Sequence, residues 1–184
     1  MQTRILVATF LICAGVLASG GQKAQPQFAN HDQLIRPEGY RQWVFVGSSL
    51  GMSYTEGPAE KSPYFTNIYL QPDAYRQFVT TGKFSDRTIL VLEVVSAGSN
   101  ASINKRGRFE DHSIGIEAAV KDEMRFPEKW AYFSFIGSGG KALAQAKPFP
   151  KEACWKCHNA HGAADNVFVQ FYPVQREARE KTQH

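Results

Sequence analysis

The motif Cys154-Trp155-Lys156-Cys157-His158 lies close to the end of the 184-residue chain. The two thiols and the imidazole stand at positions i, i+3 and i+4, which share one face of a helix. A C-x-x-C-H run is the attachment signature of a c-type haem, whose vinyl groups bond to the thiols and whose iron binds the histidine. We predict one covalent haem c on a C-terminal helix, attached through Cys154 and Cys157, with His158 as the proximal iron ligand.

Two other chemistries use a C-x-x-C pair, namely a zinc half-site and a thiol redox site. A zinc site needs a second ligand pair at metal spacing. The third cysteine, Cys13, lies in a segment expected to be removed, and His161 follows the motif far more closely than zinc-finger spacings do. A thioredoxin-like pair would require a βαβ context, which the sequence pattern lacks. Haem attachment is therefore the favoured interpretation.

The N-terminus has the pattern of a secretory signal over residues 1–20. Arg4 supplies a positive charge, residues 5–18 form an apolar run, and the small residues Ala18, Ser19 and Gly20 offer a cleavage site near 18–20. The alternative is an uncleaved anchor, in which case this segment alone would contact a membrane. We expect an exported, periplasmic protein.

Once the signal is removed, the two cysteines of the haem motif are the only ones left, which suits an oxidising compartment. Residues 21–34 are small and polar and are expected to form a flexible leader. Residues 35–184 have the length of one domain, which we interpret as a single haem-binding cytochrome domain.

The formal net charge is +4, and it is spread along the chain. The one dense basic run, Lys105-Arg106-Gly107-Arg108, is followed at once by Glu110-Asp111. A solvated loop explains this pattern better than a nucleic-acid surface, so no nucleic-acid partner is expected.

Hydrophobic patterning favours strands over helices. Apolar or alternating runs bounded by Gly, Pro or Ser predict strands at 43–46, 64–70, 88–96, 113–120 and 130–136. Helices are predicted at 72–80, where Pro and Asp fall in the first turn and Gly82 follows the end, at 151–160 and at 174–181. The predicted fold is α+β, a mostly antiparallel β-sheet with a few short helices.

The late position of the motif bears on the second axial ligand of the iron. In common electron-transfer cytochromes the motif comes early and a downstream methionine completes the coordination, whereas residues 159–184 contain no methionine. The alternatives for a sixth ligand are His31, His112, His161, His184, Met52 and Met124. None has a motif around it, so we expect five-coordinate iron with an open site for a small molecule.

Further runs follow one another along the chain: Tyr40-Arg41-Gln42-Trp43-Val44, Thr81-Gly82-Lys83-Phe84, Gly115-Ile116-Glu117-Ala118, the C-x-x-C-H motif, and Phe171-Tyr172-Pro173-Val174. This series resembles the cytochrome P-460 family, which includes cytochrome c′-beta, over about residues 36–176. The resemblance implies a mostly β fold, a homodimer and a high-spin haem whose iron is bound by His158 alone. It also implies nitric oxide or hydroxylamine as ligands, and an unidentified redox partner protein.

The same resemblance separates two functions. Members that oxidise hydroxylamine carry a lysine cross-linked to the porphyrin rim, and the matching position here is Leu92, which cannot form that bond. The favoured function is therefore a cytochrome c′-beta-like protein that binds nitric oxide. The alternatives are a hydroxylamine-oxidising enzyme and a six-coordinate electron-transfer cytochrome.

Three further residues follow from the family pattern. Phe45 and Phe65 are expected on the distal wall of the haem pocket, with ordinary core packing as the alternative. Glu117 matches a carboxylate that can relay protons from a bound nitrogen ligand, with a solvent-facing position as the alternative.

Overall fold

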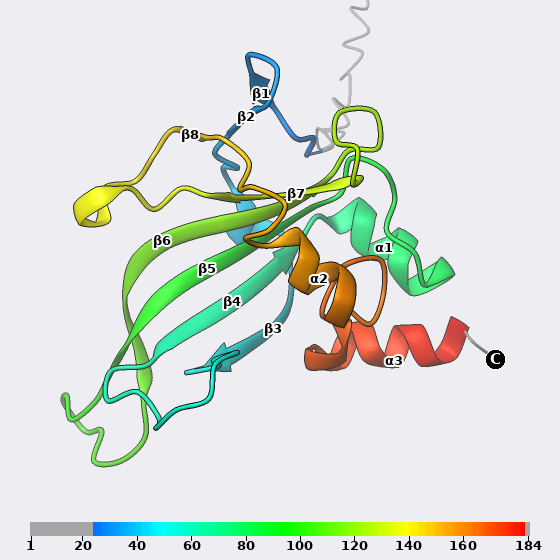
Figure 1. The fold of residues 1–184 in the computed structure, drawn as a ribbon. Coiled ribbons are helices and arrows are strands. Elements are labelled where there is room, and N and C mark those ends of the chain that lie inside the picture. The colour runs from blue at the N-terminus through cyan, green and yellow to red at the C-terminus, as the bar shows by residue number, and fades with distance from the viewer. Residues whose placement is uncertain (1–23, 183–184) are drawn as a thin grey trace, which may run out of the picture.

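Five antiparallel strands form the main sheet of the computed structural model, which describes residues 24–182. They pair in the order in which they occur along the chain, as Figure 1 shows. The strands are β3 (Val44–Leu50), β4 (Tyr64–Leu70), β5 (Ile89–Gly98), β6 (Phe109–Lys121) and β7 (Trp130–Ser134). The predicted signal at residues 1–20 lies outside the described residues.

A second sheet of three short strands covers part of one face of the main sheet. It consists of β1 (Phe28–Ala29), β2 (Gln33–Ile35) and β8 (Gln145–Ala146), in the order β1-β2-β8. Leu34 is fully buried at the centre of this cover. Residues 24–34 are thus part of the fold rather than the flexible leader expected from composition, because Leu34, Phe28 and the strand pairing hold this segment against the core.

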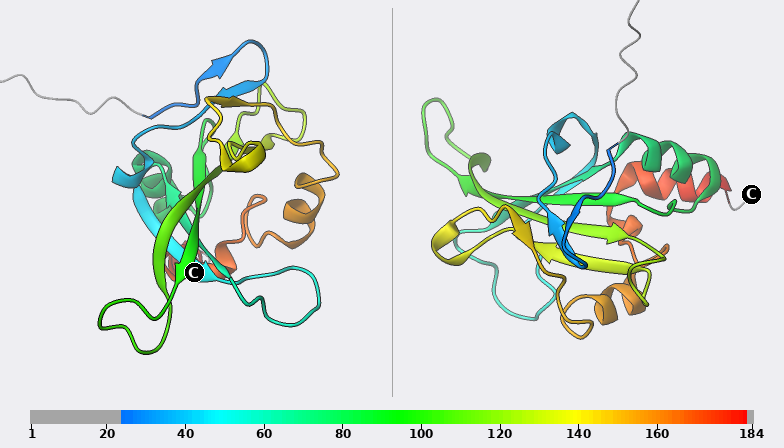
Figure 2. Two further views of the ribbon diagram at one scale, coloured as in Figure 1. Left: turned by 90° about the vertical axis from the view of Figure 1, so that its left-hand side faces the viewer. Right: turned by 90° about the horizontal axis from the view of Figure 1, so that it is seen from above.

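Three α-helices lie toward the other face, and α1 and α3 pack against each other, as the right-hand view of Figure 2 shows. They are α1 (Pro72–Thr81), α2 (Trp155–His161) and α3 (Pro173–Thr182). Three single 3-10 turns lie elsewhere in the order: η1 (Tyr40–Gln42) before β3, η2 (Ser138–Gly140) between β7 and β8, and η3 (Val169–Phe171) between α2 and α3. Helix α1 ends at Gly82, which has φ 68° and donates its N–H to the Phe78 carbonyl at 2.7 Å. Glycine adopts this left-handed conformation without steric cost, so the helix stops there.

Each face of the main sheet has its own apolar core. On the helix side, Phe78 of α1 stacks on Phe84 with ring centroids 4.4 Å apart, and Phe84 meets Trp130 edge-on at 5.9 Å. On the other side, Leu34 packs with Val91 and Phe133 beneath the small sheet. The sheet therefore separates two compartments, and the C-x-x-C-H helix belongs to the first.

The α+β prediction is confirmed, and the expected elements fall within a few residues of the observed ones. The largest differences are four residues each. Strand β3 was expected to end at Val46 but continues to Leu50 through a bulge between Phe45 and Gly47, β6 begins at Phe109 rather than at 113, and α2 begins at Trp155 rather than at 151. Within residues 24–182, no helix has both the length and the apolar character that spanning a membrane requires.

Replacing Phe78 by alanine should destabilise the fold strongly. The side chain is fully buried, so we expect Phe78→Ala to lower the free energy of unfolding by about 3–5 kcal/mol. Urea unfolding followed by circular dichroism measures this. The control is Gln77→Ala, on the exposed side of the same helix, which should stay within about 0.5 kcal/mol of wild type; equal losses for the two variants would contradict the assigned core.

Candidate haem site

The first turn of α2 presents the C-x-x-C-H motif. Cys154 caps the helix, and the His158 N–H donates to the Cys154 carbonyl at 3.1 Å. Cys154 is half-buried and Cys157 is exposed, and both are free thiols. Trp155 fixes the start of the helix, because its indole N–H donates to the Glu128 carbonyl at 3.2 Å. The i, i+3, i+4 spacing thus places two thiols and an imidazole along one side of a short, anchored helix.

His158 is held by one hydrogen bond and two aromatic rings. Its Nδ1 lies 2.9 Å from the Asn166 carbonyl oxygen, which can only accept, so Nδ1 carries the proton. Tyr132 and Phe168 flank the imidazole, with ring centroids 4.2 and 4.4 Å away. Burial lowers the pKa of His158. A neutral imidazole protonated at Nδ1 leaves the Nε2 lone pair free for a metal, which is the usual tautomer of a histidine ligand.

A cavity of about 220 Å³ opens between α2 and the helix-side face of the main sheet. Most of its wall is apolar or aromatic. Its lining residues are Tyr54, Ile68, Leu90, Leu92, Glu117, Ala118, Ala119, Tyr132, Phe133, Phe149, Cys154, His158, Asn166, Val167, Phe168 and Tyr172. An imidazole and a thiol at the wall of an apolar cavity suit a flat, largely apolar cofactor.

One wall of this cavity depends on Gly47, which follows the bulge in β3. A Cβ atom at Gly47 would lie 2.7 Å from Cδ1 of Tyr172, closer than side-chain atoms approach. Glycine at this position therefore allows the Tyr172 ring to pack flat against β3 and to line the cavity.

Two of the residues predicted for the pocket lie together in this cavity. Leu92 and Glu117 are directly opposite each other on β5 and β6, and both line the cavity. Burial raises the pKa of Glu117, while a hydrogen bond with Ser134 partly offsets that rise. Glu117 is thus a carboxyl group inside the cavity wall, a position from which it can hold or release a proton.

The structure does not bring Phe45 and Phe65 into the cavity. Phe45 pairs with Tyr69 across β3 and β4, its ring lies edge-on to the Tyr69 ring at 5.7 Å, and it is 51% exposed. Phe65 pairs with Val95, three positions from Leu92, so it faces the opposite side of the sheet. The expectation that these two phenylalanines form the distal wall is corrected accordingly, because strand alternation turns both away from the cavity.

Several residues of the cavity wall were not anticipated from the sequence. Tyr54 comes from the β3–β4 loop and stacks on Phe168 at 5.8 Å, and Tyr132 comes from β7. Asn166 contributes through its main-chain carbonyl. The aromatic content of residues 130–136 indicated a strand but not its orientation, and no sequence pattern identifies a backbone carbonyl as a partner.

Alternative ligands lie elsewhere in the part of the chain that is described. His31, His112 and His161 are exposed, Met52 is 43% exposed and Met124 is 93% exposed, and none of them lines the cavity; His184 lies outside the described residues. Over residues 24–182, no group of three His, Cys, Asp or Glu side chains is gathered that could hold a metal ion. The main sheet is antiparallel throughout, so the βαβ setting of a thioredoxin-like pair is also missing there.

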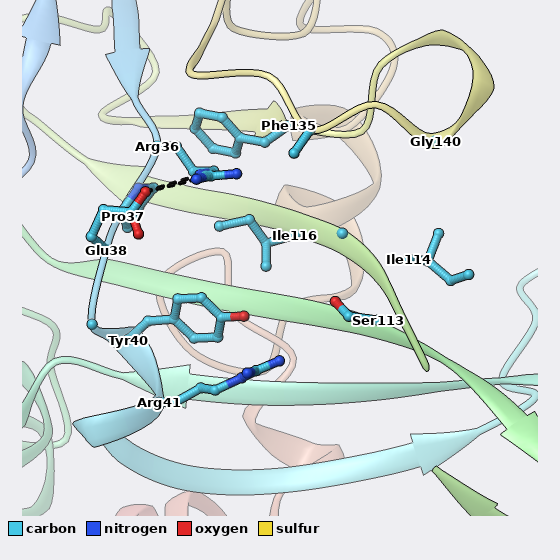
Figure 3. Close-up of a pocket in the computed structure, with 13 residues that line it drawn as sticks. Arg36, Pro37, Glu38, Tyr40, Arg41, Ser113, Ile114, Ile116, Phe135 and Gly140 are labelled. Carbon is cyan, nitrogen blue, oxygen red and sulfur yellow. Dashed lines mark hydrogen bonds and ion pairs between the residues drawn. The ribbon is translucent and has the colours of Figure 1, made fainter. Parts of the chain in front are cut away.

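A second cavity, of about 450 Å³, lies on the opposite face of the sheet (Figure 3). Tyr40 and Arg41 point into it, but its arginines are already paired. Arg36 bridges to Glu38 at 2.9 Å, and Arg41 Nε donates to the buried Glu93 carboxylate at 2.9 Å. Neither a thiol nor an imidazole is among its lining residues, so the cavity beside α2 is the one with the chemistry of a cofactor site.

The family model described as Cytochrome P460 matches residues 37–169. The chain belongs to the cytochrome P460 family. A search of curated proteins found no match. Membership implies a haem c cofactor, so the residues around α2 should be able to hold one.

The residues present fit that cofactor. A cytochrome P460 haem needs two thiols, one neutral imidazole and an apolar wall. Cys154 and His158 line the aromatic cavity, and Cys157 is exposed on the same helix, one residue before His158. The Nδ1–H bond to Asn166 is the orienting contact that a ligating histidine requires. When bound, the haem supplies an iron centre that can take up small ligands and exchange electrons.

Removing the charge of Glu117 should change how stability depends on pH. Because the folded-state pKa of Glu117 is raised, the contribution of this group is fully present below pH 4.5, its ordinary value, and is lost as the pH rises through the folded-state pKa. Glu117→Gln should therefore gain stability relative to wild type as the pH rises above 4.5, measured by urea unfolding across pH. Ser134→Ala is the matched variant and should raise the pKa of Glu117 further; parallel pH profiles for wild type and Glu117→Gln would contradict the assignment.

Proposed function

We propose that this cytochrome P460 family member is an exported monohaem c-type cytochrome with five-coordinate iron that binds nitric oxide or a similar small ligand. Thioether bonds to Cys154 and Cys157 hold the haem, and Nε2 of His158 is the one protein ligand to the iron. The observation that carries the proposal is the cavity wall beside α2. Its lining residues include one imidazole and no methionine, so among the described residues neither a second histidine nor a methionine stands near the first ligand.

The nature of the wall supports binding rather than hydroxylamine oxidation. Leu92 occupies the position of the cross-linking lysine, and its side chain lies in the cavity wall. The lining residues include no lysine that could substitute for it. Lys151 and Lys156 on either side of Trp155 are directed to Glu128 and Glu152, at 2.9 and 3.8 Å.

Glu117 supports a role for proton exchange with a bound nitrogen ligand. It is the only carboxylate among the lining residues of the cavity, and burial favours its protonated form. A ligand that gains or loses a proton on the iron would have this group as its nearest carboxyl partner. This is the one feature of the wall that also suits the enzymatic alternative, hydroxylamine oxidation.

We propose a homodimer as the assembly, and the periplasm as its location. The exposed apolar side chains on the face of β3 and β4 away from the cavity, Phe45 and Leu50, support a second copy as the partner. The signal pattern at residues 1–20 supports export. A redox partner protein would have to deliver electrons, and its identity is a matter for experiment.

The optical spectrum of the purified haem protein tests the central proposal. We expect a high-spin five-coordinate spectrum in the reduced state, and a clear change when nitric oxide or carbon monoxide is added. Sharp low-spin bands that carbon monoxide leaves unchanged would overturn the open site. A strongly red-shifted ferrous Soret band would instead indicate a cross-linked haem and the oxidising enzyme.

Substitution of the proximal histidine provides a matched test within one helix. In His158→Ala the haem should remain attached through its two thioether bonds, but the spectrum should lose the features of an imidazole-bound iron. His161→Ala removes an exposed imidazole from the same helix outside the cavity, and it should retain the wild-type spectrum. The assignment fails if His158→Ala is spectrally identical to wild type.

The proposed dimer is tested by its molar mass in solution. Light scattering after size-exclusion chromatography should give twice the chain mass for wild type. Phe45→Glu places a charge on the half-exposed ring position and should shift the protein to monomer, with the haem spectrum unchanged. Met124→Glu, at a residue 93% exposed in the β6–β7 turn, is the control and should remain dimeric; a monomeric wild type would refute the dimer alone.

A further inference from the structure

The carbonyl oxygen of Asn166 accepts two hydrogen bonds from two sides. His158 Nδ1 donates to it at 2.9 Å, and the Tyr132 hydroxyl donates to it at 3.2 Å. A carbonyl oxygen has two lone pairs, so both bonds can form together. The Tyr132 ring also packs against the imidazole of His158. Tyr132 therefore contacts His158 directly through its ring, and acts on it indirectly through the hydroxyl that bonds to the shared carbonyl.

The loop that carries this carbonyl is held firmly in place. Asp165 and Asn166 have φ values of 46° and 62°, a left-handed pair that turns the chain back toward α2. The Asp165 carboxylate accepts from Lys121 Nζ at 2.7 Å and from the Trp130 indole N–H at 3.2 Å. Lys121 is itself buried, and it donates to the Phe84 carbonyl at 2.9 Å. Strands β6 and β7 therefore fix the position of the Asn166 carbonyl through the side chain of Asp165.

We propose that Tyr132 and Asp165 are positioning residues that set how strongly His158 donates to the iron, Tyr132 by weakening the Nδ1–H bond and Asp165 by maintaining it. This inference rests on the proposed role of His158 as the iron ligand. It adds two residues that do not touch the iron but change the strength of the hydrogen bond made by its ligand, His158.

The physical reason lies in the shared acceptor. Each donor withdraws electron density from the Asn166 oxygen, so a hydroxyl already bonded there leaves the oxygen a weaker acceptor for the Nδ1–H. A stronger Nδ1–H bond gives the imidazole more anionic character and a more basic Nε2. A more basic ligand stabilises ferric over ferrous iron and strengthens the bond from iron to histidine.

The test compares Tyr132 with a tyrosine outside the cavity, Tyr64. Tyr132→Phe keeps the ring against His158 but frees the carbonyl for Nδ1–H alone, so the reduction potential should fall and the iron–histidine stretching frequency of the ferrous protein should rise. Tyr64→Phe removes a hydroxyl from a tyrosine of β4 that is 46% exposed and does not line the cavity, and it should leave both values unchanged. Equal shifts in the two variants, or no shift in Tyr132→Phe, would overturn the inference.

Asp165→Asn should shift the reduction potential and the iron–histidine stretching frequency in the opposite directions from Tyr132→Phe. Losing the charge loosens the anchor to Lys121 and weakens the Nδ1–H bond, so the potential should rise and the stretching frequency should fall. General damage to the pocket would move both variants in one direction, which would contradict the proposal. Should Asp165→Asn not fold, the tyrosine pair decides. The wild-type spectrum is recorded first: if it lacks five-coordinate iron, the proposed function fails, whereas a correct spectrum with unshifted variants refutes only this inference.

Discussion

The hydrogen bond from His158 Nδ1 to the Asn166 carbonyl is the constraint on which the rest of the site depends. It selects the tautomer of the imidazole, and it leaves Nε2 as the free ring nitrogen of a residue that lines the cavity. Its two ends lie only eight positions apart, yet each is secured by a distant part of the chain. Trp155 fastens the helix to the Glu128 carbonyl, and Asp165 fastens the loop to Lys121 and Trp130. A local contact is thereby made rigid by the main sheet.

The two faces of the main sheet differ in how they treat buried carboxyl groups. The face toward α2 is apolar and aromatic, and it carries one carboxyl group, Glu117, whose pKa is raised by burial. The other face buries a different carboxylate, Glu93, which binds Arg41 and accepts a hydrogen bond from Tyr40 at 2.7 Å. Charge on that side is neutralised within the fold, whereas the lining of the cavity around Glu117 contains no lysine or arginine. Proton chemistry is accordingly expected on the face toward α2.

Aromatic rings line the cavity from segments far apart in sequence, and this arrangement suits small ligands. Tyr54, Tyr132, Phe168 and Tyr172 come from a loop, a strand and the two segments after α2. Their close packing depends on Gly47, where any side chain would displace the Tyr172 ring. Under the proposed function, Leu92 in place of a cross-linking lysine leaves this wall suited to reversible ligand binding at an iron held by His158 alone.

The amino-acid sequence by itself determined the haem motif, the α+β class, the five strands of the main sheet and the three α-helices, because these follow from local spacing and hydrophobic period. It did not predict the short strands β1, β2 and β8. It placed Leu92 and Glu117 on neighbouring strands, which pair directly. It did not determine which face Phe45 and Phe65 occupy, since alternation specifies two sides of a strand but not which side meets α2. Only the tertiary structure decided that, together with the role of the Asn166 carbonyl, because every residue carries a carbonyl and folding alone brings this one within reach of His158 and Tyr132.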